Sequence, residues 1–175
     1  PTRSELDLAI DGGGFFELED ASGSRFYSRA GRFRLDSQGY MAAPNGMRLT
    51  SGVQIPADAS GLRISEGGEV SAVLAGSDER VALGSIVLVT FASLAGLESH
   101  GDNLLRATPD AGSPMSQVAG EEGAGLLRQG YLEMANVDMI DEMTGLVLAQ
   151  RAYQLNARVL QASDQILETI NNLRR

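Results

Sequence analysis

The residues best suited to acid–base or nucleophilic chemistry are three near neighbours, Ser99, His100 and Asp102, which include the only histidine of the chain. A serine, a histidine and an aspartate can act together as nucleophile, general base and orienting carboxylate. In enzymes of this type the three residues converge on one reacting atom from separate elements of the fold. Neighbours in one polar segment do not converge in this way. We therefore expect His100 to lie in a surface loop without a catalytic role.

A glycine-rich segment, Asp11-Gly12-Gly13-Gly14, follows a predicted strand and has to be considered as a phosphate-binding loop. Such a loop needs a helix directly after the glycines, because the amino end of that helix binds the phosphate. Here Phe15 and Phe16 continue as a strand instead. We therefore interpret the glycines as a sharp turn or bulge against a neighbouring strand.

Three pairs of carboxylates are the remaining candidates for chemistry: Asp7/Asp11, Glu17/Glu19 and Glu121/Glu122. A glycosidase needs two carboxylates that face each other across a cleft, and the sequence indicates no enclosed pocket for any of these pairs. With one histidine and no cysteine, a zinc site would need carboxylates almost alone. The sequence therefore predicts no catalytic residue, no metal site and no cofactor.

The composition excludes several classes of partner. The chain of 175 residues is 43% hydrophobic, as is typical of a soluble globular protein, and contains no cysteine that could form a disulfide. Its net charge of -9 comes from 23 acidic residues against 14 basic ones, all of them arginine. Such a chain lacks the positive field that duplex DNA or an anionic membrane requires. Because its longest apolar run is only strand-length, we also expect no membrane insertion.

Residues 1–125 predict a compact β-rich body. Short runs of alternating apolar and polar residues are separated by Gly, Ser and Asp, which is typical of about eight or nine antiparallel strands and hairpins. The strongest hairpin signal is Pro44-Asn45-Gly46, for which we predict a type I′ turn. Residues 126–175 predict a connecting strand, 126–132, and then one long helix from residue 136. The predicted fold is therefore mainly β with a carboxy-terminal helix.

The helix carries two rows of apolar residues at a spacing of seven, the repeat of a coiled-coil seam. One row is Met139, Leu146, Tyr153, Leu160 and Leu167, and the second is Ala152, Val159, Ile166 and Leu173. At about 1.5 Å per residue the helix would be roughly 55 Å long, more than a small domain can cover. We therefore predict an assembly interface formed by Met139, Met143, Leu146, Tyr153, Val159, Leu160, Ile166, Leu167, Ile170 and Leu173.

Two segments near the ends of the chain resemble signatures of the bacterial flagellar rod and hook proteins. Residues 6–16, LDLAIDGGGFF, are similar to the opening of the β domain in that family. Residues 130–138, GYLEMANVD, and 150–156, QRAYQLN, resemble its carboxy-terminal signature. Similar segments lie between them in the family's order, at residues 27–33, 55–57 and 96–104. Within the family, residues 55–57 and 123–130 resemble the distal rod subunits most, whereas Met134, Ala135 and Gln154 depart from the usual residues.

The resemblance implies a non-enzymatic structural subunit of the distal rod, exported without a cleaved signal peptide. It implies polymerisation into a helical tube that spans the periplasm and transmits torque, with terminal helices inside and the β domain outside. It also implies contacts with neighbouring rod and hook proteins and with surrounding ring proteins. Because the chain starts with Pro1 and a strand pattern, we expect the amino-terminal helix to lie upstream of it.

Three other functions stay open at this point. The chain could be a rod-like or hook-like paralogue within the same family. It could be a binding module that does not polymerise and presents its helix to one soluble partner, such as a secretion chaperone. It could also be a periplasmic hydrolase that acts on cell-wall glycan through one of the carboxylate pairs.

Overall fold

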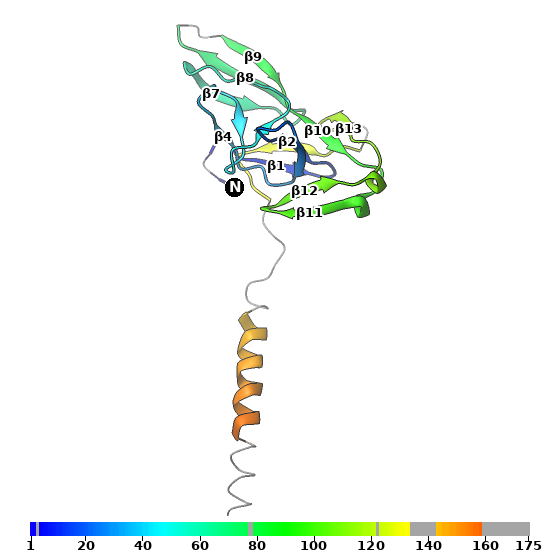
Figure 1. Ribbon diagram of the computed structural model, residues 1–175. Coiled ribbons are helices and arrows are strands. Elements are labelled where there is room, and N and C mark those ends of the chain that lie inside the picture. The colour runs from blue at the N-terminus through cyan, green and yellow to red at the C-terminus, as the bar shows by residue number, and fades with distance from the viewer. Residues whose placement is uncertain (3, 77–78, 122, 134–142, 159–175) are drawn as a thin grey trace, which may run out of the picture. The chain divides into compact units, whose positions relative to one another are not determined.

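The computed structural model describes residues 1–2, 4–76, 79–121, 123–133 and 143–158 (Figure 1). The chain divides into two compact units, Pro1–Glu133 and Met134–Arg175, and each is described by itself. The first unit is built from short strands, and the described part of the second is a helix at residues 143–158. The predicted fold class, a mainly β body followed by a carboxy-terminal helix, is confirmed.

The described part of the first unit contains more and shorter strands than the sequence predicted. Two short 3-10 helices, Leu94–Gly96 and Pro109–Ala111, lie among them. The strands are β1 Leu8–Asp11, β2 Phe16–Glu19, β3 Arg25–Ser28, β4 Arg34–Leu35, β5 Met41–Ala42, β6 Arg48–Leu49, β7 Ala59–Ile64, β8 Glu69–Leu74, β9 Arg80–Ser85, β10 Val87–Thr90, β11 Leu97–Gly101, β12 Leu104–Ala107, β13 Met115–Val118 and β14 Leu126–Gln129.

These strands form antiparallel sheets. The largest has the order β11-β12-β3-β2-β6-β5-β4, a second has the order β7-β8-β9, and two further pairs are β10-β13 and β1-β14. The β1-β14 pair joins the two ends of the unit and places Leu8 opposite Gln129. Strand β14, which we expected to connect the body to the helix, is therefore part of the body's own sheet structure.

The amide of Gln129 fastens this pair to the three-stranded sheet. Its nitrogen donates to the backbone oxygens of Glu5, at 2.8 Å, and of Leu62, at 3.0 Å. Its oxygen accepts the backbone N–H of Ile64 at 3.1 Å. One side chain therefore satisfies three backbone groups and links the segment before β1 to the edge strand β7.

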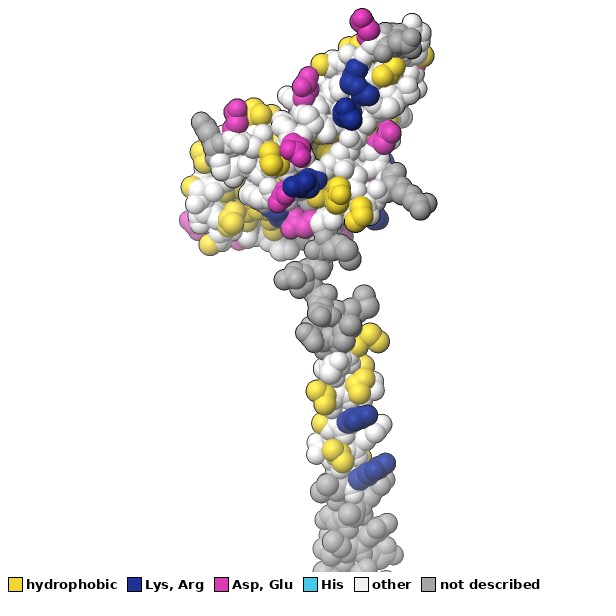
Figure 2. Space-filling model, turned by 180° about the vertical axis from the view of Figure 1, so that it is seen from behind, with side chains coloured by type: hydrophobic (Ala, Val, Ile, Leu, Met, Phe, Trp, Pro, Cys, Tyr) yellow, Lys and Arg dark blue, Asp and Glu magenta, His cyan; other side chains and the backbone are white. Residues whose placement is uncertain are grey.

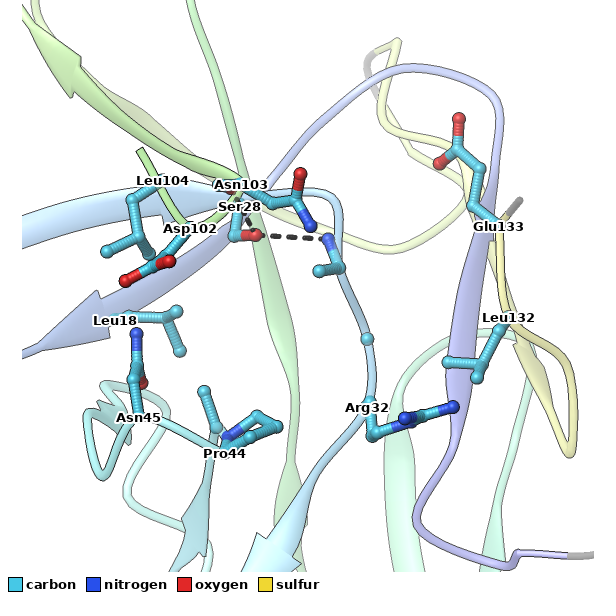
Figure 3. Close-up of a pocket in the computed structure, with 13 residues that line it drawn as sticks. Leu18, Ser28, Arg32, Pro44, Asn45, Asp102, Asn103, Leu104, Leu132 and Glu133 are labelled. Atoms are coloured by element: carbon cyan, nitrogen blue, oxygen red, sulfur yellow. Dashed lines mark hydrogen bonds between the residues drawn. The ribbon is translucent and has the colours of Figure 1, made fainter. Parts of the chain in front are cut away.

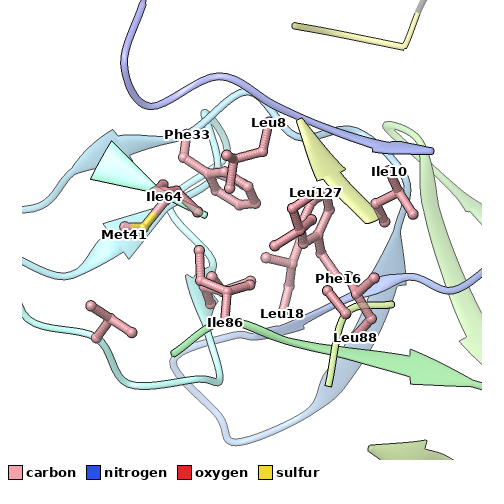
Figure 4. Packing of buried hydrophobic residues seen from close by; sticks show 14 of the residues in the cluster. Leu8, Ile10, Phe16, Leu18, Phe33, Met41, Ile64, Ile86, Leu88 and Leu127 are labelled. Atoms are coloured by element: carbon pink, nitrogen blue, oxygen red, sulfur yellow. The ribbon is translucent and has the colours of Figure 1, made fainter. Parts of the chain in front are cut away.

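The hydrophobic core lies where the two end strands meet the middle of the unit (Figure 4). Leu8, Phe16, Leu88 and Leu127 are at most 1% exposed, and they come from β1, β2, β10 and β14. Burying a side chain of this size stabilises the fold by about 1.5–3 kcal/mol. The core therefore requires both ends of the first unit to be in place at once.

The hairpin at Pro44-Asn45-Gly46 differs from the predicted type I′ turn. The N–H of Gly46 donates to the oxygen of Ala43 at 2.9 Å, which places Pro44 and Asn45 at the two central positions of the turn. Only Gly46 has a positive φ, of 89°, and it follows the turn as a bulge residue. The prediction was wrong because Pro44 fixes a negative φ at a position that a type I′ turn of this register needs positive.

The type I′ geometry occurs instead at Asp102 and Asn103, which join β11 to β12. Both residues have positive φ, of 50° and 58°. Asp and Asn tolerate the left-handed region better than other non-glycine residues do, so this two-residue turn suits them. His100 belongs to β11 and not to a loop, and that part of the prediction was wrong. Its ring lies 5.1 Å from the ring of Phe26.

Gly31 allows two backbone segments to touch. Its oxygen accepts the N–H of Leu8 at 2.8 Å, and a Cβ at this position would overlap the carbonyl group of Leu8. Leu8 itself is fully buried, so β1 cannot move away without opening the core. A side chain at residue 31 therefore conflicts directly with core packing.

We predict that Gly31→Ala lowers the free energy of unfolding by about 3 kcal/mol or more, because overpacking forces β1 out of place. Gly46→Ala is the matched control, since Gly46 has a positive φ but no atom near its missing Cβ. The control should cost only about 1–2 kcal/mol of backbone strain. Urea unfolding followed by circular dichroism measures both, and equal losses would contradict the role of the close contact.

Candidate assembly interface

The helix at residues 143–158 exposes large apolar side chains. Exposed fractions are 64% for Met143, 61% for Leu146 and 78% for Tyr153, three of the predicted interface residues. Figure 2 shows hydrophobic side chains along this helix, coloured yellow. The other predicted interface residues lie outside the described part of the chain: Met139, Val159, Leu160, Ile166, Leu167, Ile170 and Leu173.

The apolar side chains of this helix occupy opposite faces. With roughly 100° between successive residues, Leu146 and Tyr153 share one face of the helix. Leu148 and Leu155 lie on the opposite face, about 180° away, and both are at least 60% exposed. The predicted interface does not include this second face, although Leu148 and Leu155 also stand at a spacing of seven. A helix that is apolar on opposite faces is normally buried on both.

The charges of the helix are all positive. Arg151 and Arg158 are the only charged residues within residues 143–158, and they stand seven apart on one flank. The complete chain carries a net charge of -9, so the helix has the opposite sign to the chain as a whole. Between its two apolar faces the helix therefore presents a basic edge.

A second feature, the Arg29 contact, lies where the first unit ends. The guanidinium of Arg29 donates to the backbone oxygens of Gly12, at 3.0 Å, and Gly14, at 3.1 Å. It also donates to the oxygen of Ile10 at 3.2 Å and to the carboxylate of Glu133 at 2.8 Å. One side chain thus joins the glycine turn after β1 to the last residue of the unit.

The glycine turn fits closely against the segment that precedes β14. Gly12 and Gly14 have φ values of 124° and 109°, which are open to glycine but strained for other residues. A Cβ on Gly12 would lie 2.8 Å from the Cα of Gly125, and Gly125 donates its N–H to the oxygen of Gly13 at 2.7 Å. The interpretation of these glycines as a turn against neighbouring backbone is therefore confirmed.

A groove of about 560 Å³ lies beside the end of the first unit (Figure 3). Ser28 stands in its wall, where its hydroxyl donates to the oxygen of Asn103 at 2.8 Å and accepts the N–H of Ala30 at 3.0 Å. The groove is lined by Leu18, Ser28, Ala30, Gly31, Arg32, Ala43, Pro44, Asn45, Asp102, Asn103, Leu104, Leu132 and Glu133. Its carboxylates, Asp102 and Glu133, belong respectively to the type I′ turn and to the Arg29 contact.

The structure does not assemble the residues that could have formed a triad. No hydrogen bond links the described side chains of Ser99, His100 and Asp102. Among the carboxylates considered above, Asp11 pairs with Arg128 at 2.8 Å. Glu17 accepts hydrogen bonds from Thr50 at 2.8 Å and from Tyr27 at 3.3 Å. Asp11 and Glu17 are thus engaged by neighbouring side chains, and the lack of a cofactor stays a prediction.

Comparison with known proteins matches both ends of the chain to flagellar families. Residues 9–72 match the flagellar hook protein FlgE/F/G D1 domain, and residues 128–173 match the carboxy-terminal region of flagellar basal body rod FlgEFG proteins. The flagellar basal-body rod protein FlgG of Bacillus subtilis is 39% identical over 179 residues, which cover 99% of this chain and 67% of that protein. The chain belongs to the FlgG family of flagellar basal-body rod proteins.

Other relatives agree with this membership. FlgG of Caulobacter vibrioides is 39% identical over 99% of this chain, and FlgG of Agrobacterium fabrum is 37% identical over 97%. The chain spans 66% and 65% of those two proteins. The flagellar hook protein FlgE of Salmonella typhimurium is 41% identical over 119 residues, 68% of this chain and 29% of that protein. The resemblance to rod and hook proteins is confirmed.

The two matched regions of this FlgG-family chain meet at the Arg29 contact, because Arg29 lies in the first region and Glu133 in the second. Both residues lie within the family segments named above, at 27–33 and 130–138, but no role was predicted for either. The helix at residues 143–158 lies within the second region. Among the helices that the structure describes, none is long and apolar enough to cross a membrane.

The Tyr27 hydroxyl lies beside Glu17, and its ionisation is expected to affect the stability of the body at alkaline pH. Tyr27 is 4% exposed, and its ring packs at a right angle against Phe91 with centroids 4.7 Å apart. Burial raises the pKa of Tyr27 above its ordinary value of 10.0, and the negative charge of Glu17 raises it further. The folded protein therefore favours the neutral phenol more than the unfolded chain does.

We predict that the resulting stabilisation is complete below pH 10.0, the unfolded pKa, and is lost as the pH rises through the higher folded pKa. Tyr27→Phe should flatten this loss of stability with pH. The control is Tyr131→Phe, since Tyr131 is 47% exposed. Urea unfolding across the alkaline range tests this, and a loss of stability with pH that Tyr27→Phe leaves unchanged would contradict it.

Proposed function

We propose that this chain is a structural, non-enzymatic subunit of the flagellar basal-body rod, in its distal part. In this proposal the subunits polymerise into a helical tube, with the helix at residues 143–158 packed inside it and the β body outside. The division into an outer β-rich domain at residues 1–125 and a connecting strand with the coiled-coil-like helix at 126–175 belongs to this proposal. The tube would transmit torque across the periplasm, after export of the subunits without a cleaved signal peptide.

The observation that carries the proposal is the pair of opposite apolar faces on the helix. One partner helix covers a single seam of a coiled coil. Leu146 and Tyr153 on one face and Leu148 and Leu155 on the other therefore require neighbours on two sides. A subunit packed inside a tube has neighbours on several sides, and this geometry favours a polymer over a module that binds one soluble partner.

Membership of the FlgG family favours a rod subunit over a hook subunit. The FlgG relatives match over almost all of this chain, whereas the match to the hook protein covers 68% of it. We propose neighbouring rod and hook subunits and the surrounding ring proteins as the other partners. A hydrolase is disfavoured because Asp11 and Glu17 are engaged by Arg128, Thr50 and Tyr27.

We predict that Leu146→Asp and Leu155→Asp, each introduced into the gene as the cell encodes it, both abolish rod formation and motility. Each change removes about 1.5–3 kcal/mol of apolar burial per subunit and adds the cost of burying a charge. Purified variants should keep the melting temperature of the β body. Electron microscopy of basal bodies and swimming assays measure the outcome.

His100→Ala serves as the control, because His100 lies in β11 at the edge of the body's largest sheet. It should leave rods and motility intact. If Leu155→Asp cells swim while Leu146→Asp cells do not, the helix has one buried face and the single-partner module becomes the better explanation. If both variants swim, the assembly role assigned to the helix is wrong.

A further inference from the structure

We propose that Arg29 and Glu133 form a clamp that holds residues 131–133, the last residues of the β body, against the glycine turn. Because the assembling helix follows these residues in the chain, the expected effect on assembly rests on the function proposed above. Both residues are positioning residues, since they act through residues 131–133. The proposal depends on three observations: how Arg29 is held, what else holds Glu133, and how a similar ion pair nearby differs.

Arg29 is held in place before it reaches Glu133. Three of its four hydrogen bonds go to the backbone oxygens of Ile10, Gly12 and Gly14. Ile10 belongs to β1, and Gly12 and Gly14 belong to a turn that is itself fixed by the hydrogen bond between Gly125 and Gly13. The guanidinium therefore loses little further freedom when it binds a carboxylate, and its Nε is already directed to one place.

Glu133 has no comparable support from its own backbone. The last backbone hydrogen bond of the unit near this end is donated by Gly130 to the oxygen of Asp7, at 2.8 Å. Beyond Gly130, within the described residues 131–133, the 2.8 Å contact from Arg29 to Glu133 is the one hydrogen bond present. Leu132 is half-buried in the wall of the groove, and the side chain of Glu133 therefore adds the one polar contact that holds residues 131–133.

The ion pair between Arg128 and Asp11 provides a comparison. It joins the same kinds of atoms at the same distance, 2.8 Å from Nε to a carboxylate oxygen. Its two residues, however, belong to β14 and β1, which are already held together by their ladder of paired residues. Loss of the Arg128 pair should leave the strands in register, whereas loss of the Arg29 pair should release residues 131–133.

The experiment compares Glu133→Gln with Asp11→Asn in the complete chain. Because the sequence contains no cysteine, a single Tyr131→Cys change allows one nitroxide label to be attached in each variant. Electron paramagnetic resonance then reports the mobility of the label, and thermal melts report the stability of the body. Introducing the same changes into the cellular gene and counting rods gives the effect on assembly.

In Glu133→Gln we expect the label's rotational correlation time to shorten by about twofold or more, with the melting temperature of the body unchanged. Asp11→Asn should not change the label's mobility. About 1 M NaCl should mobilise the label in the parent chain by screening the ion pair, and should have no such effect in Glu133→Gln. Arg29→Gln should mobilise the label and also lower the melting temperature, because the turn loses its donors.

The outcomes separate this inference from the proposed function. Unchanged label mobility in Glu133→Gln overturns the clamp, whatever happens to the rods. A freed label with a normal number of rods overturns the role of the clamp in assembly, while the Leu146 and Leu155 variants still test the function independently. A freed label with fewer rods, against normal rods in Asp11→Asn, is the result that the clamp predicts.

Discussion

The arrangement of the β body depends on how it satisfies the backbone groups of one glycine turn. The turn at Gly12 and Gly14 directs carbonyl oxygens toward the side chain of Arg29, and Gly14 is buried, where a polar group without a partner is costly. Arg29 supplies the missing donors from the neighbouring strand connection. The same guanidinium also binds Glu133. Arg29 therefore connects the glycine turn near the start of the unit to the last residue of the unit.

Small residues make this connection possible at close range. Gly31 lets the backbone of β1 touch the connection that follows β3, and Gly125 lets the segment before β14 touch the glycine turn. Side chains at these positions would separate Arg29 from its acceptors as well as opening the core. The family segment at residues 27–33 is thus explained physically: Tyr27 packs and binds Glu17, Ser28 holds the type I′ turn, Arg29 binds the glycine turn, and Gly31 allows contact.

The sequence predicted those features that depend on local periodicity. Alternation revealed the short strands, and the spacing of apolar residues revealed the helix, of which residues 143–158 are described. It could not reveal contacts set by the tertiary fold: nothing local marks Arg29 as the partner of Ile10, Gly12, Gly14 and Glu133. The turn type was also predicted wrongly, because Pro44 fixes a negative φ, whereas Asp102 and Asn103 tolerate a positive one. For the interface, the heptad rows predicted from the sequence include Leu146 and Tyr153 but not Leu148 and Leu155.

The two parts of the chain differ in how far they bury their apolar side chains. The β body buries its core residues without a neighbour, as Leu8 and Phe16 show, although a few large apolar side chains such as Leu94 stay exposed. The helix buries none of its large apolar side chains among the described residues, and each left in water forgoes about 1.5–3 kcal/mol. A single neighbour could recover this only on one face, so the second face still favours a further subunit. Stabilisation that requires two neighbours at once favours growth of a polymer over isolated pairs, because every subunit added inside the array satisfies both faces.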